Sequence, residues 1–322
     1  MSTEPSAAVS SNAPLAATAP PRARATGFGG EWWVVFRHEF RRFLWSAWTL
    51  VAMGIYGGIA AGILKFFQWI EEKTPLKALN EALTPEQRQE AIAQALGQAG
   101  IANAGDVADY VRDHVPFTYI GFFLTASFFL PLLVAIVSFD QFSELSTRGA
   151  RFVLLRVRRT TYFLGKAVAA MIAVVAFLLI TWVIVAASTA ARSPGEELPY
   201  VLKEAVRGWL LMSVTALPYL SLTAIVSAFT RPVWAFLLTF GTYVGLFIAW
   251  LIASALPGWL EGGALDALAA PARKLHLLFP WEHLAKLISR DTPTVMSGVI
   301  GLLLIAAAGY GAALYVVRRR DV

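Results

Sequence analysis

The chain has 322 residues, of which 57% are hydrophobic and only 15% are charged, and its mean hydropathy is +0.60. Water-soluble proteins of this length carry more charge, and several charge-free runs are as long as the ~20 residues that cross a bilayer. These numbers exclude a soluble enzyme and predict a multispanning membrane protein. Because the chain has no cysteine, disulfides, thiolate metal sites and cysteine nucleophiles are excluded as well.

Six charge-free runs rich in Leu, Ala, Val, Ile and Phe predict six transmembrane helices. They cover residues 48–64 (continuing to about residue 70), 117–139, 167–191, 208–229, 233–255 and 295–317. The ten-residue alternation of polar and apolar residues that is typical of membrane barrels is missing. We therefore predict an all-α polytopic protein, whose backbone hydrogen bonds close within its helices.

The distribution of basic residues predicts the orientation. If the N-terminus is cytoplasmic, that side carries 15 Lys and Arg residues against six acids, and the other side carries 12 against 15. The positive-inside rule then places both termini in the cytoplasm, and we expect a multi-pass protein of a bacterial cytoplasmic membrane. Since the basic surface faces the anionic lipid bilayer, it does not imply a nucleic-acid partner.

The N-terminal region divides at about residue 30. Residues 1–30 are rich in Ala, Pro and Ser and predict a disordered cytoplasmic tail. Residues 31–46 predict an interfacial amphipathic helix, with aromatic rings toward the hydrocarbon and arginines toward the headgroups. Its candidate surface residues are Trp32, Trp33, Phe36, Arg37, Phe40 and Arg41. Such a helix is either a simple anchor or an elbow that transmits force to the first span.

Two segments are predicted outside the cytoplasm. Residues 71–116 carry eight acids and four bases, and the capping box that begins at Thr84 predicts a helical hairpin. This hairpin either binds an extracytoplasmic partner or packs on its own subunit. Residues 256–294 contain short apolar pieces and predict re-entrant or interfacial helices. Pro280 separates His276 from His283, so we expect no metal site there.

The predicted spans contain no charged residue except Lys65, near the end of the first one. Transporters driven by ion gradients usually keep a charged residue inside the membrane, so no such ion site is expected. A phosphate-binding loop is missing, because Gly165-Lys166 has no glycine five residues earlier. The paired aspartates, Ser/His pair or zinc motif of an intramembrane protease are also missing. We expect neither catalysis nor a resident cofactor in this chain.

The cytoplasmic segment 140–166 carries the functional argument. An acid near its start, a glycine, an apolar stripe and then arginines predict a short amphipathic helix on the membrane surface. A generic positive-inside linker is the alternative. The candidate partner contacts are Glu144, Arg148, Gly149, Arg151, Phe152, Leu155, Arg156, Arg158 and Arg159.

This segment resembles the corresponding loop of ABC-type-2 transporter permeases. The matching residues are Glu144, Gly149, Leu154-Leu155, Arg159 and Gly165-Lys166, together with Phe279-Pro280 and the basic C-terminal end at Arg319-Arg320. Val157 replaces a common proline and Ala150 a common threonine. The resemblance covers residues 31–322 and implies that residues 47–322 form a permease domain. It also implies that the loop is a coupling helix held by a separate ABC ATPase subunit, which binds the ATP and Mg²⁺.

The resemblance further implies a working unit of two permeases, expected to be a homodimer, and two ATPases. Phenylalanines such as Phe122 and Phe128 favour an amphipathic or lipid-like cargo over a small ion. We therefore expect an ATP-driven exporter. Two alternatives stay open: a mechanotransmission module that moves an outside partner through residues 71–116, and an ATP-independent scaffold or channel.

Overall fold

The computed structural model describes residues 28–73, 87, 117–139, 141–142, 157–192, 198–260, 274, 276–289 and 291–319. Within these ranges every regular element is a helix, which confirms the all-α prediction. Six of the described helices are long and apolar enough to cross a membrane. They are α2 (Ala47–Lys73), α6 (Phe117–Ser138), α8 (Arg159–Ala190), α9 (Leu198–Phe229), α10 (Pro232–Leu260) and α13 (Thr292–Arg319).

Two of these helices begin well before the residues predicted from charge-free runs. Helix α8 begins at Arg159 instead of residue 167, and α9 begins at Leu198 instead of residue 208. The predicted ranges hold no charge besides Lys65, but the longer helices α8 and α9 include the charged residues Lys166 and Glu204, and both are buried. A charge-free run marks only the part of a helix that suits hydrocarbon. The helix itself continues wherever its charged side chains find partners.

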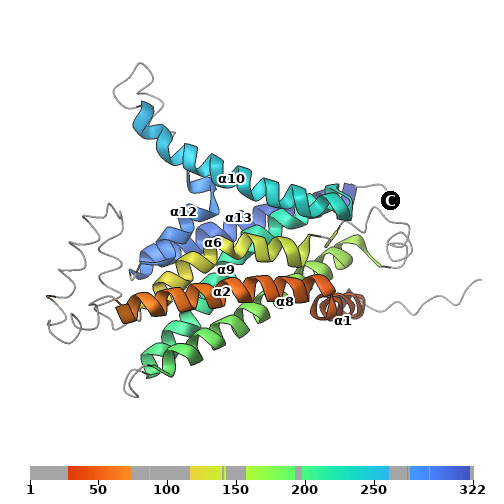
Figure 1. Cartoon of the computed structure of the whole chain (residues 1–322). Helices are drawn as coiled ribbons and strands as arrows, with labels where there is room; N and C mark the ends of the chain where they lie inside the picture. Colours follow the sequence, from red (N-terminus) through yellow and green to blue (C-terminus); the bar gives the residue numbers. More distant parts are fainter. Residues whose placement is uncertain are drawn as a thin grey trace, which may run out of the picture.

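Helix α9 is the centre of the bundle. It packs along α13, α8 and α6, while α2 packs mainly on α6. Helix α10 makes fewer contacts, chiefly with α9 and α6, and it diverges from the other spans toward its C-terminal end (Figure 1). The apolar windows of α10 and α13 are each 17% buried, compared with 72% for α6, and of these two α10 has far less contact with the other helices. The bundle therefore has a closed centre around α6 and α9 and an open flank at α10.

Close packing around Trp182 shows how the centre is filled. Its indole contacts Tyr119 and Phe122 edge-on, with ring centroids 5.7 and 5.3 Å away. A Cβ atom at Gly208 would collide with this indole, so only glycine lets α9 approach α8 here. Small residues at helix crossings are typical of membrane bundles, where association depends on close packing.

Helix α1 (Phe28–Trp45) lies across the spans at one end of the bundle, and Figure 1 shows it almost end-on while the spans run across the view. This is the orientation of a helix that lies in a membrane surface. The helix begins three residues before Glu31, so the predicted tail of residues 1–30 is helical at 28–30. We call this end of the bundle, where α8 begins and α13 ends, the α1 end.

The opposite end carries two short elements, the 3₁₀ helix η4 (His276–Leu278) and the helix α12 (Pro280–Leu287). Pro280 occupies the first turn of α12, where its missing N–H is tolerated. Helix α12 packs on α13 (Figure 1), and we call this end the α12 end. Of the predicted hairpin at 71–116, the structure describes only residues 71–73 and Gln87. The hairpin prediction itself lies outside the described residues.

Candidate functional site at the α1 end of the bundle

Lys166 is the most unusual residue of the α1 end, because its side chain is fully buried in the second turn of α8. Its Nζ donates a hydrogen bond of 2.9 Å to the carbonyl oxygen of Gln141 and lies 3.5 Å from Oε1 of Glu39. The ammonium group also lies 5.0 Å from the centroid of the Tyr162 ring. A buried ammonium persists only where such partners replace water. The contacts join α8 to α1 and to the residues that follow α6.

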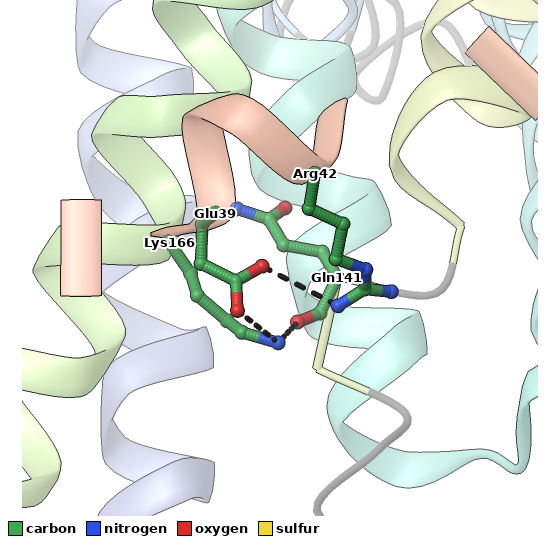
Figure 2. Close-up of polar contacts among 4 residues, drawn as sticks. All are labelled: Glu39, Arg42, Gln141 and Lys166. Carbon is green, nitrogen blue, oxygen red and sulfur yellow. Dashed lines mark hydrogen bonds and ion pairs between the residues drawn. The ribbon is translucent and has the colours of Figure 1, made fainter. Parts of the chain in front are cut away.

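Glu39 is the carboxylate that compensates this charge, and it is only 5% exposed. Its Oε1 faces Lys166 and its Oε2 lies 3.3 Å from Nη1 of Arg42, one helical turn further along α1. Figure 2 shows the four residues together, with Glu39 between the two cations and Gln141 beside Lys166. Each carboxylate oxygen therefore has a cationic partner, which a buried charge requires.

Gly165 brings the two helices close enough for this ion pair. A Cβ atom at this position would lie 2.7 Å from Cγ1 of Val35 and 3.3 Å from the backbone nitrogen of Phe36. Any larger residue would push α1 away from α8. The Gly165-Lys166 pair thus has two linked roles: the glycine admits the α1 backbone, and the lysine fixes it through Glu39.

Helix α8 includes residues 159–166 of the predicted loop 140–166, which leaves the segment 140–158 between α6 and α8. Both described ends of this segment are attached to the start of α8. Near the start of the segment, Phe142 is fully buried and its ring stacks on Phe163 at a centroid distance of 4.9 Å. After it, Arg159 donates a hydrogen bond of 2.8 Å to the carbonyl oxygen of Arg318. Arg318 in turn donates one of 3.0 Å to Oγ1 of Thr160, so the end of α13 is attached as well.

The structure describes only part of the predicted contact set. Arg158 is exposed at the N-cap of α8, and Arg159 bonds to α13. The other predicted contacts lie outside the described residues; they are Glu144, Arg148, Gly149, Arg151, Phe152, Leu155 and Arg156. Their assignment to an ATPase therefore stays a prediction.

The rings predicted on α1 form a ladder along the helix, and Phe36 and Phe40 are partly buried against the core of the bundle. Phe36 stacks on Trp32 at 5.1 Å and on Phe40 at 5.7 Å between ring centroids. Trp33 is 54% exposed, and Arg37 and Arg41 are exposed as well. The fully buried side of α1 consists of Val35, Glu39 and Phe43, and Glu39 alone among these three is charged.

The sequence reasoning missed Glu39, Gln141 and the buried role of Lys166. One signal was present, since Glu39 lies four residues after Val35 and four before Phe43, which places a carboxylate within an apolar stripe. A charge in that position predicts a buried partner. The partner itself could not be named, because Lys166 is distant in the sequence.

Among the described residues, no three His, Cys, Asp or Glu side chains are grouped so that they could hold a metal ion. His283, considered above as a ligand, has its Nε2 2.9 Å from the carbonyl oxygen of Leu277. The α1 end therefore offers buried charges and close backbone contact. Such an arrangement suits the mechanical connection of helices.

Comparisons with known proteins agree with this architecture. A model of the family described as ABC-2 family transporter protein matches residues 33–321, nearly the whole described bundle and all of the α1 end from Trp33 onward. No curated protein matches the chain. With six helices that can cross a membrane and a family match over most of its length, the chain belongs to the ABC-2 family and is a membrane permease of an ABC transporter.

Proposed function

We propose that this permease works as a homodimer with two separate ABC ATPase subunits in the cell membrane. In this proposal the segment 140–158 is the coupling element that the ATPase holds. The cargo is an amphipathic or lipid-like molecule moved out of the cytoplasm or the inner leaflet. ATP and Mg²⁺ belong to the partner subunit.

The observation that carries the proposal is that both described ends of this segment are attached to the start of α8, which is itself joined to α1. Lys166 binds the carbonyl oxygen of Gln141, near the start of the segment, and Glu39 of α1. Gly165 brings the backbones of α1 and α8 into contact. A displacement of the segment would therefore move α1 and the start of α8 together.

A mechanism follows from these contacts. Closure of the ATPase dimer upon ATP binding would push the segment and shift α8, and the hydrogen bonds of Arg159 and Thr160 to Arg318 would pass the movement to α13. A packed bundle responds to such a push by changing between discrete arrangements. ATP supplies the energy by favouring one of the two arrangements.

The charge distribution supports an amphipathic cargo. In the described spans the buried charged residues, Lys166 and Glu204, lie within the first turns of α8 and α9. The middle of the bundle is lined by rings and aliphatic side chains such as Phe122, Leu130 and Met212. These side chains do not replace the hydration shell of an ion.

The proposal is tested by purifying the permease from native membranes and identifying what accompanies it. We expect an ATPase with a phosphate-binding loop in equal amount, and ATP hydrolysis that responds to the permease after reconstitution in vesicles. Glu144→Lys should reduce this response while the inserted permease unfolds as before. The control is Glu282→Lys, the same charge reversal in α12 at the opposite end of the bundle.

Each result decides between the proposal and its rivals. A permease that purifies without an ATPase would favour a scaffold or channel. An ATPase that responds normally to Glu144→Lys would reject the coupling element. ATP hydrolysis without movement of a fluorescent lipid across the vesicle membrane would reject lipid export and favour force transmission to an outside partner.

A further inference from the structure

A hollow on the surface of α1 has no role in the coupling mechanism. Among the described residues it is lined by His38, Arg41, Arg42 and Trp45. These positions follow one another at intervals of three, one and three residues, so their side chains share one face of the helix. The hollow is thus a feature of α1 itself, next to the start of α2.

The lining of the hollow favours an anion. It combines two guanidinium groups, an imidazole and an indole N–H, and none of these four side chains is acidic. The nearest carboxylate on this part of α1, Glu39, is buried and already faces both Lys166 and Arg42. Arginine pairs well with phosphate, because its planar fork can donate two parallel hydrogen bonds.

The surroundings of the hollow favour a lipid as the source of that anion. Trp45 is 78% exposed, and in α2 Trp48 is 57%, Val51 46% and Ile55 44% exposed. These α2 residues belong to a helix that can cross the membrane, and they recur at helical spacing on one side of it. A headgroup in the hollow would therefore continue into acyl chains along this apolar stripe. If an acidic protein surface occupied the hollow instead, the apolar stripe of α2 and the indoles of Trp45 and Trp48 would stay in water.

From these observations we propose that the hollow is a binding site for the phosphate of an anionic phospholipid. The site is connected to the ion pair at the α1 end through Arg42. Its side chain is 28% exposed and lies between the hollow and Glu39, with Nη1 3.3 Å from Oε2. A bound phosphate would share Arg42 with Glu39, so headgroup binding would change the contacts that hold α1 on α8.

The lipid measurement uses the permease alone, so it does not depend on the proposed ATPase. The purified chain is placed in bilayer discs, and the relative affinity for spin-labelled phosphatidylglycerol over phosphatidylcholine is measured. The double variant His38→Gln/Arg41→Gln should lose about fivefold or more of this preference, because each basic residue near an anionic surface contributes about 1 kcal/mol. The matched control is Arg37→Gln, which removes an exposed arginine of α1 that does not line the hollow.

The control distinguishes a specific binding site from a general attraction between the positive charge of α1 and anionic lipid. If Arg37→Gln lowers the preference as much as the double variant, only the overall positive charge matters and the proposal is overturned. Arg41→Lys, which keeps the charge but not the fork, should give an intermediate loss. The melting temperatures of all variants are compared, so that a loss of structure is not mistaken for a loss of binding.

Two further results would identify a different ligand. If inorganic phosphate at millimolar concentration displaces the spin-labelled lipid, the site takes phosphate from solution and the lipid assignment fails. If the double variant keeps its lipid preference but no longer co-purifies with an ATPase, the hollow is a protein contact. If the double variant keeps both its lipid preference and its co-purifying ATPase, the hollow has no role in either interaction and the proposal is rejected.

Discussion

The two ends of the bundle attach a short helix by different physical means. At the α1 end, α1 is held by a buried ion pair, Glu39 with Lys166, and by the backbone approach at Gly165. At the α12 end, α12 is held by rings and small residues. Trp281 is 8% exposed, and its ring lies 5.7 Å from Tyr219 and 5.4 Å from Phe247.

A glycine lies at each of the two attachments, but a Cβ atom added at each would meet different groups. At Gly165 an added Cβ would strike Val35 and the backbone of α1, whereas at Gly301 it would strike the ring of His283. The comparison shows where a movement can be transmitted. An ion pair joins two particular side chains, so a displacement of one helix passes directly to the other. Ring packing instead distributes the contact over several neighbours.

The largest effect is expected at the ion pair. Lys166→Met leaves Glu39 buried without its main partner, and we expect a loss of about 3–5 kcal/mol in the free energy of unfolding. The measurement is unfolding in mixed micelles with increasing SDS. Glu39→Gln in the same chain should restore part of the stability, with an interaction energy of about 1–3 kcal/mol. Additive losses in the double variant would show that the two residues do not interact.

Removing the ring that anchors α12 should cost less. Trp281→Ala is expected to lower the free energy of unfolding by about 2 kcal/mol, because lipid tails are as apolar as the bundle interior and the loss is mainly one of packing. A second substitution, such as Tyr219→Phe, should not restore the stability lost in Trp281→Ala, whereas Glu39→Gln should restore part of that lost in Lys166→Met. The same SDS titration measures it, and a loss larger than that of Lys166→Met would reverse the comparison of the two ends.

The glycine contact at the α1 end gives a third test. Gly165→Val should cost about 1–3 kcal/mol, as overpacking does elsewhere, and should release α1 from α8. Hydrogen exchange of the α1 amides measures this release. Gly58→Val in α2 is the control, since a Cβ atom there has nothing within 4 Å. Equal exchange in both variants would contradict the close approach of α1.

The smallest effect is expected for Arg42, which is partly exposed. Arg42→Gln should change the free energy of unfolding by no more than about 1 kcal/mol, because solvent screens the partly exposed guanidinium group of Arg42. Lys166 still faces Glu39 in this variant. A loss as large as that of Lys166→Met would mean that Arg42 is the main partner of the carboxylate.

Individual residues show how far the sequence prediction reached. The six spans were predicted correctly in number and order, because each contains a long apolar run. The starts of α8 and α9 were placed too late, because Lys166 and Glu204 were read as residues outside the helices. Arg159 bonds to the carbonyl oxygen of Arg318, a contact that the sequence did not predict, while its contact with an ATPase stays a prediction. Charge alone does not tell which group an arginine meets.

The sequence by itself determined that this protein resides in a membrane, that it is all-α and that it has six spans. These properties depend on the length and polarity of single segments, because a bilayer requires apolar helices that satisfy their own backbone hydrogen bonds. Only the tertiary structure decided that Glu39 meets Lys166, that Gly165 lets α1 pack against α8, and that the hollow on α1 lies next to the exposed apolar stripe of α2. Such contacts join segments that are distant in the chain, and they exist only once the helices have packed.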